Sequence, residues 1–147
     1  MATRSTIALE FADGTVGQVY AHWDGYLDHN GRILLANYQD PFTLQKLIDL
    51  GDLSSLAEYV TPEPYTEHTF DKPSPEVCVF YGRDRGETDV GPRYFKDFAD
   101  YKANHQYEEY EYILRTDGNW YVSEYSGDYK LLAIELAEEE VVGYKDY

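Results

Sequence analysis

The chain has 147 residues, of which 43% are hydrophobic, which is enough for one domain with a core and too few for two. Twelve Lys and Arg residues against 28 Asp and Glu residues give a formal net charge of −16, which argues against direct binding of nucleic acid or of an anionic membrane. Because no apolar run could cross a bilayer and no signal-like segment precedes the first strand pattern, we expect one cytoplasmic domain over residues 1–147.

The first predicted element is a β-hairpin. Residues 5–11 alternate between apolar and polar side chains, and residues 15–23 alternate again. The Asp13-Gly14 dipeptide between them is typical of a two-residue type I′ turn. We therefore predict two antiparallel strands joined at this dipeptide.

A helix is predicted after the hairpin. Apolar residues recur at helical spacing from Leu27 to Tyr38. The alternative is a turn at residues 28–31, with Asn30 capping a shorter helix. The spacing favours the longer helix.

A second helix begins at Asp40, because Asp is a good N-cap and the following Pro41 suits the first helical position. Gly51 is expected to end it. Residues 52–60 continue as a turn or a short helix. Residues 61–76 hold four of the six prolines, and this predicts a loop without regular structure.

A central strand and a second hairpin are predicted in the C-terminal half. Residues 77–81 are apolar on both faces, which is typical of a strand with neighbours on each side. Residues 108–115 alternate before Asp117-Gly118, which again predicts a two-residue hairpin turn. Residues 131–142 are rich in Ala, Leu and Glu and favour a helix.

Together these elements predict an α+β fold. The expected sheet is antiparallel or mixed and has five or six strands, built from the two hairpins and the central strand. Three or four helices are expected to pack on it.

Residues 22–31 combine two histidines with two aspartates, and imidazole and carboxylate groups are metal ligands. No zinc spacing is met, however, and Asp24 and Asp28 have simpler uses, as a helix cap and as an ion-pair partner for Arg32. The only cysteine, Cys78, is interpreted as a small buried side chain. No phosphate loop or nucleophile elbow occurs. We predict no metal, no cofactor and no catalytic residue.

A small-ligand pocket is one functional interpretation. Guanidinium groups hold phosphates and aromatic faces stack on bases, so a nucleotide is the natural ligand. The candidate binding residues are His22, Trp23, Asp24, Tyr26, Arg83, Arg85 and Glu87. In the alternative interpretation, the arginines pair with neighbouring carboxylates in a solvated loop.

Three blocks resemble a family of small proteins from phages and prophages. They are His-Trp-Asp-Gly-Tyr at residues 22–26, Leu-Gly-Asp-Leu-Ser-Ser-Leu at residues 50–56 and Asp-Arg-Gly-Glu at residues 84–87. Members often have Cys before the His, where this chain has Ala21. The resemblance implies a phage setting. By analogy, small acidic phage proteins often bind and disable a host factor, some of them by mimicking DNA.

The leading prediction is a phage-encoded acidic accessory protein, not an enzyme, that binds and inhibits a host defence or nucleic-acid-handling protein in the host cytoplasm. The expected partner has a basic surface, and the oligomeric state is left open, with a homodimer among the options. A nucleotide-binding protein is the alternative, and an enzyme comes third. The predicted acidic face comprises Glu108, Glu109, Glu111, Glu138, Glu139 and Glu140.

Overall fold

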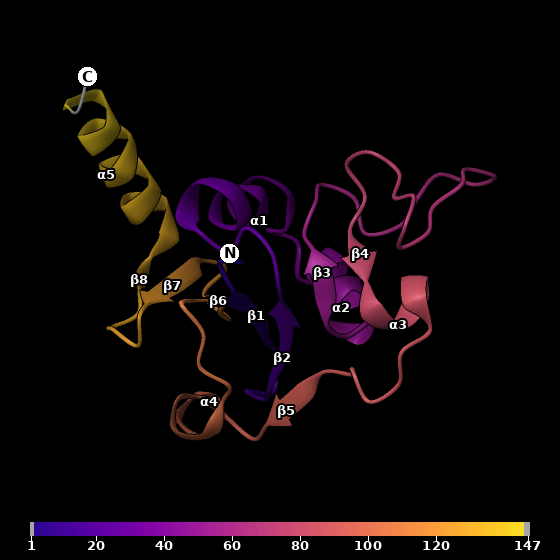
Figure 1. The fold of residues 1–147 in the computed structure, drawn as a ribbon. Helices are drawn as coiled ribbons and strands as arrows, with labels where there is room; N and C mark the ends of the chain where they lie inside the picture. Colours follow the sequence, from indigo (N-terminus) through magenta and orange to yellow (C-terminus); the bar gives the residue numbers. More distant parts are fainter. Residues whose placement is uncertain (1, 146–147) are drawn as a thin grey trace.

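The computed structural model describes the backbone of residues 2–145 and the side chains of residues 2–139. A mixed sheet carries helices on both faces (Figure 1). The strands are β1 (Ser5–Glu10), β2 (Val16–Ala21), β3 (Leu53–Ser55), β4 (Val79–Phe80), β5 (Arg93–Phe95), β6 (Tyr110–Leu114), β7 (Trp120–Glu124) and β8 (Lys130–Leu131). The helices are the π-helical turn η1 (Leu27–Gly31), α1 (Arg32–Asn37), α2 (Pro41–Asp49), α3 (Tyr81–Arg85), α4 (Phe98–Asn104) and α5 (Leu132–Lys145).

The α+β class is confirmed, but the sheet is larger than predicted. Within residues 2–145 it has eight strands in the order β4-β3-β2-β1-β6-β7-β8, with β5 paired to β2 beside this path. The additional strands β3, β5 and β8 have two or three residues each. Such short strands show no alternating pattern, because two or three residues are too few to establish one.

Both predicted hairpins form, but each loop has three residues instead of two. The backbone N–H of Gly14 donates to the Phe11 carbonyl at 2.9 Å, and that of Gly118 donates to the Arg115 carbonyl at 2.9 Å. In each loop only the glycine has a positive φ, +92° and +83° respectively, whereas a type I′ turn needs two such residues. Each loop is therefore a tight turn closed by one left-handed glycine.

The helix predicted from residue 27 is present as η1 followed directly by α1. Asn30 does not cap it. Instead Asn30 is buried, and its Nδ2 donates to the Trp23 carbonyl at 3.3 Å. Asp40 caps α2 as predicted, because its Oδ1 accepts from the backbone N–H of Phe42 at 3.1 Å.

The strand predicted at the centre of the sheet lies at its edge. Within the described residues β4 pairs with β3 alone, and β3 is built from residues expected to form a turn or a helix. β4 is nevertheless buried, because α3 follows it at once and the Arg83 guanidinium lies 4.8 Å from the centre of the Phe80 ring. The coverage by this helix explains why an edge strand is apolar on both faces.

Two cores lie on opposite faces of the sheet. Ile7 and Leu9 of β1 pack with Leu34 of α1 and other helix residues in the larger core. Ala8, which points the other way, packs with Tyr101 of α4 in the smaller one. In Figure 1, α1 and α4 accordingly lie on different sides of β1, and α5 extends away from the sheet. No helix among the described residues is long and apolar enough to span a membrane.

Candidate functional site

Residues 22–26 follow the end of β2 and form the turn into η1. The Tyr20 hydroxyl lies 2.6 Å from Nδ1 of His22, and the Trp23 ring meets the His22 ring edge-on at a centroid distance of 4.7 Å. Trp23 and Tyr26 are 44% and 39% exposed. Asp24 has a φ of +57° and its side chain does not cap the helix, contrary to the prediction.

The glycine of this block holds the turn against β1. The N–H of Gly25 donates to the Thr3 carbonyl at 2.8 Å, and the Gly25 carbonyl accepts from the Tyr112 hydroxyl at 2.6 Å. A Cβ at this position would lie 2.7 Å from the Cβ of Ser5. The turn therefore packs so closely that no side chain fits, which is a structural role for the His-Trp-Asp-Gly-Tyr block.

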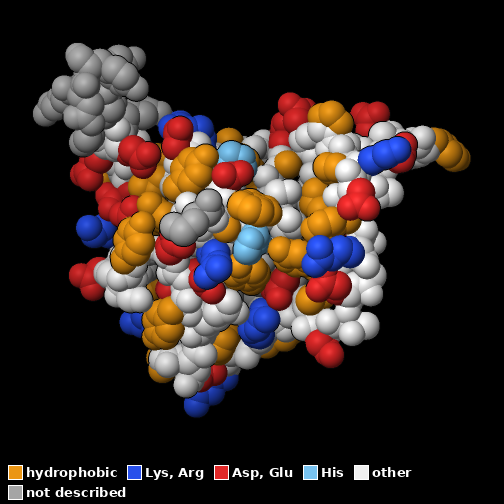
Figure 2. All heavy atoms as spheres, in the orientation of Figure 1, with side chains coloured by type: hydrophobic (Ala, Val, Ile, Leu, Met, Phe, Trp, Pro, Cys, Tyr) orange, Lys and Arg blue, Asp and Glu red, His pale blue; other side chains and the backbone are white. Residues whose placement is uncertain are grey.

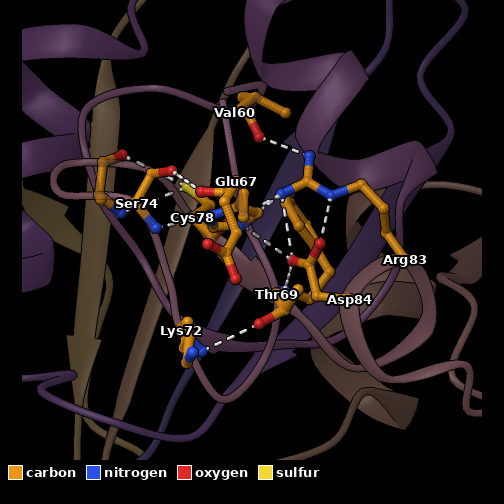
Figure 3. Close-up of polar contacts among 11 residues, drawn as sticks. Val60, Glu67, Thr69, Lys72, Ser74, Cys78, Arg83 and Asp84 are labelled. Carbon is orange, nitrogen blue, oxygen red and sulfur yellow. Dashed lines mark hydrogen bonds and ion pairs between the residues drawn. The ribbon is translucent and has the colours of Figure 1, made fainter. Parts of the chain in front are cut away.

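The Arg83 guanidinium is directed into the protein and not toward solvent. It donates to the Val60 carbonyl at 2.6 Å, to the Cys78 carbonyl at 2.9 Å and to Oδ1 of Asp84 at 2.9 Å (Figure 3). Burial alone would raise the pKa of Asp84, but its hydrogen bonds from Arg83 and the backbone of Phe80 outweigh burial and lower that pKa. Arg83 and Asp84 thus form an ionised pair, which we call the clamp, and it binds Val60 and Cys78 on either side of the loop of residues 61–76.

His68 completes this clamp in its neutral form. Its Nδ1 accepts from the backbone N–H of Ser74 at 2.9 Å, so the ring proton is on Nε2. Nε2 then donates to the Cys78 carbonyl at 3.1 Å. Cys78 is fully buried, which confirms it as a small buried side chain, and burial raises the pKa of its thiol. The cluster fastens the loop of residues 61–76 to the end of the sheet.

Arg85 is also engaged. It forms an ion pair with Glu87 and lies 4.2 Å above the Phe70 ring. Among the described residues, neither Arg85 nor Arg83 contacts residues 22–26 through a hydrogen bond, ion pair or ring contact, and β3 lies between the strands that lead to the two segments. The geometry thus agrees with the alternative of arginines paired with neighbouring carboxylates.

The predicted acidic residues do not form one face. Glu111 is only 1% exposed, because α4 covers the side of β6 to which it points. Glu108 and Glu109 are half-buried, and Glu138 and Glu139 are exposed on α5. The side chain of the sixth, Glu140, lies outside the described residues.

A different concentration of negative charge lies where β7 meets α5. Burial raises the pKa of Glu124, and the nearby carboxylates of Glu135 and Glu139 raise it further. Burial and the nearby negative charges therefore both disfavour the ionised form of Glu124.

We expect Glu124→Gln to raise the free energy of unfolding at neutral pH by up to about 0.5 kcal/mol, because it removes this repulsion. The folded protein binds the Glu124 proton more tightly than the unfolded chain, so its contribution to stability is full below the ordinary pKa of 4.5 and is lost as the pH rises through the raised value. Urea unfolding across this pH range tests the prediction. A difference from the parent that persists at pH 4 contradicts it.

The sheet face covered by α4 contains a cavity of about 440 Å³. Phe98 and Lys102 of α4, Glu111 of β6 and Ser123 of β7 contribute to its walls, and residues 126–129 close one side. At its floor, Nε2 of His105 lies 2.5 Å from Oε1 of Glu111, and both side chains are 1% exposed. Both members of this acid–base pair are therefore almost completely withdrawn from water.

The pair is saturated with hydrogen bonds. Nδ1 of His105 lies 2.5 Å from the Tyr101 carbonyl, which can only accept, so Nδ1 carries a proton. Glu111 also accepts from the Tyr129 hydroxyl at 3.0 Å and from the backbone N–H of Glu108 at 3.3 Å. A pair so fully engaged ties the end of α4 to the sheet, and it offers little to a substrate.

Sequence reasoning missed this pair. His105 and Glu111 are six residues apart in an acidic segment, and alternation placed Glu111 on the polar side of its strand. The available signal was the aromatic spacing at Tyr101 and Tyr107, whose ring centroids lie 4.4 and 4.2 Å from that of His105. Aromatic residues around one histidine indicate burial.

No group of three potential metal ligands converges within the described residues.

No protein family, curated protein or solved structure was found to match this chain. The resemblance of residues 22–26, 50–56 and 84–87 to small phage proteins therefore stays a prediction.

Proposed function

We propose that this protein is a phage-encoded acidic accessory protein that occupies a basic surface of a host protein, most directly one that handles nucleic acid. The supporting observation is the excess of negative over positive side-chain charge. The formal net charge is −16, and at least six of the twelve basic side chains are already neutralised by carboxylates of the same chain. These six are Arg32, Arg83, Arg85, Arg93, Arg115 and Lys130.

The charge left for a partner is therefore mostly negative. In Figure 2, Asp and Glu side chains are spread around the visible face, and apolar side chains gather near its middle. On this face the acidic side chains are thus spread out and do not form one strip. Such a field attracts a basic surface and competes with the phosphates of a nucleic acid for it. The resemblance to phage proteins supports a host protein as the source of that surface.

The test is capture of a partner from nuclease-treated bacterial lysate, followed by binding measurements with the purified partner. We expect the dissociation constant to rise at least about tenfold between about 50 and 200 mM salt, because exposed charges are screened. The partner is also expected to release its nucleic acid when this protein is added. Salt-independent binding by a partner that keeps its nucleic acid contradicts the proposal.

Charge reversal shows whether position matters as well as net charge. We expect Glu138→Lys with Glu139→Lys, on the exposed part of α5, to slow association, because long-range fields steer the encounter. The matched control reverses Glu63 and Glu67 in the loop of residues 61–76, which are also exposed. An equal effect of both pairs assigns the steering to net charge alone.

A further inference from the structure

The parallel pairing of β1 with β6 brings the two Asp-Gly loops to the same end of the sheet. Leu9 lies opposite Leu114 in this pair, and both strands run in the same direction into their loops. The first turn of α2 reaches the same place, because one groove is lined by residues of both loops and of that turn. Segments far apart in the sequence thus form one surface.

The groove has a volume of about 400 Å³ and a largely apolar lining. Its apolar lining residues are Leu9, Phe11, Ala12, Pro41 and Phe42, and Thr116 and Gly118 line it from the second loop. Phe42 is 77% exposed. An exposed phenylalanine beside an apolar groove leaves hydrophobic surface in water, and such surfaces are typical of binding sites. We call this surface the turn groove.

Three aspartates are adjacent in sequence to residues that line the turn groove, and no ion pair among the described residues neutralises them. Asp13 and Asp117 belong to the two loops, and Asp40 directly precedes Pro41. Their hydrogen-bond donors are neutral: Thr15 for Asp13, the backbone of Phe42 for Asp40, and Tyr121 and the backbone of Asn119 for Asp117.

Two of these aspartates are held in their ionised form. The hydrogen bonds from the Thr15 side chain and backbone lower the pKa of Asp13. The hydrogen bonds from the Tyr121 hydroxyl and the Asn119 backbone lower the pKa of Asp117. Arg115 also lines the turn groove, but Glu10 holds its guanidinium at 3.1 Å. The charge presented at the rim is therefore negative.

We propose that the turn groove binds a segment of the basic partner in which one large apolar side chain is flanked by Lys or Arg. The apolar side chain fills the groove beside Phe42, and its basic neighbours meet the three aspartates. This inference rests on the proposed function and adds the place and chemistry of the contact. A buried apolar anchor supplies most of the affinity, and surrounding charges supply orientation. A second copy of this chain fits poorly, because its charge of −16 repels the same rim.

The test uses short synthetic peptides as probes. The first is rich in Lys and Arg with one central Leu, the second has Ser in place of Leu, and the third keeps Leu but has Gln in place of each basic residue. Binding is followed by fluorescence anisotropy and by backbone amide shifts of the labelled protein. We expect the first peptide to bind at least about tenfold more tightly than the others. We expect its shifts to centre on Phe42 and Gly118.

Variants separate the anchor from the charge. Phe42→Ala is expected to weaken the first peptide about tenfold, whereas the matched control Tyr65→Ala, which removes another exposed aromatic side chain, leaves its affinity unchanged. Replacing Asp13, Asp40 and Asp117 with Asn is expected to remove most of the salt dependence. Asn keeps the turn and cap roles of Asp, so the fold is retained.

Each result has a defined meaning. If both basic peptides bind equally and Phe42→Ala has no effect, the turn groove is not the contact and the proposed function stands. If only the neutral Leu peptide binds there, the groove takes an apolar partner and the charge argument is overturned. If no basic peptide binds at low salt, both the inference and the proposed function are contradicted.

Discussion

Replacing His105 with Phe is expected to lower the free energy of unfolding by about 3–5 kcal/mol, because it leaves the buried Glu111 carboxylate without its imidazole partner. The carboxylate is 1% exposed, so water cannot replace the lost donor. Phe preserves the ring packing between Tyr101 and Tyr107, at centroid distances of 4.4 and 4.2 Å in the parent protein. The substitution therefore changes the hydrogen bonding more than the packing.

Urea unfolding of a double-mutant cycle measures this effect. The second variant combines His105→Phe with Glu111→Leu, which removes both members of the pair. We expect the double variant to be more stable than His105→Phe alone, because an apolar pair is less costly to bury than a single unpaired charge. A loss below about 1 kcal/mol for His105→Phe, within the range of ordinary substitutions, contradicts the assigned role of the pair.

Replacing Gly51 with Ala is the second large effect, with an expected loss of about 3 kcal/mol or more from backbone strain and steric overlap together. Gly51 has a φ of +86°, and its Cβ would lie 2.2 Å from the Val90 carbonyl oxygen. That oxygen cannot easily move, because it accepts the backbone N–H of Asp52 at 2.8 Å. The end of α2 and the segment around Val90 are therefore held together at a distance that only glycine allows.

Gly86 provides a matched control. It also has a positive φ, +74°, and it also follows a helix, but apart from its chain neighbours no residue has an atom within 4 Å of where its Cβ would be. We expect Gly86→Ala to cost only the strain of the backbone, about 1–2 kcal/mol. The difference between the two variants in urea unfolding isolates the overlap with Val90. Equal losses would show that the close approach does not matter.

The sequence by itself determined the local elements. Both hairpins were predicted, because strand alternation and an Asp-Gly dipeptide act within a few residues of each other. The cap at Asp40 and the helix after residue 27 were predicted for the same reason, since N-caps and helical spacing are local patterns. The three-residue loops were missed, because the same dipeptide fits both loop lengths and the pairing of the strands selects between them.

Only the tertiary structure decided which of these elements meet. Alternation correctly placed Glu111 on the opposite face of β6 from Tyr112, but it could not show that α4 covers that face and buries Glu111 with His105. In the sequence Arg83 is only one of several charges in a predicted loop. The folded chain surrounds its guanidinium with Val60, Cys78 and Asp84.

The turn groove likewise depends on β1 lying parallel to β6, a contact between residues about a hundred positions apart. Nothing within either strand specifies that neighbour. The packing of the whole sheet selects it, and with it the convergence of the two loops with the first turn of α2.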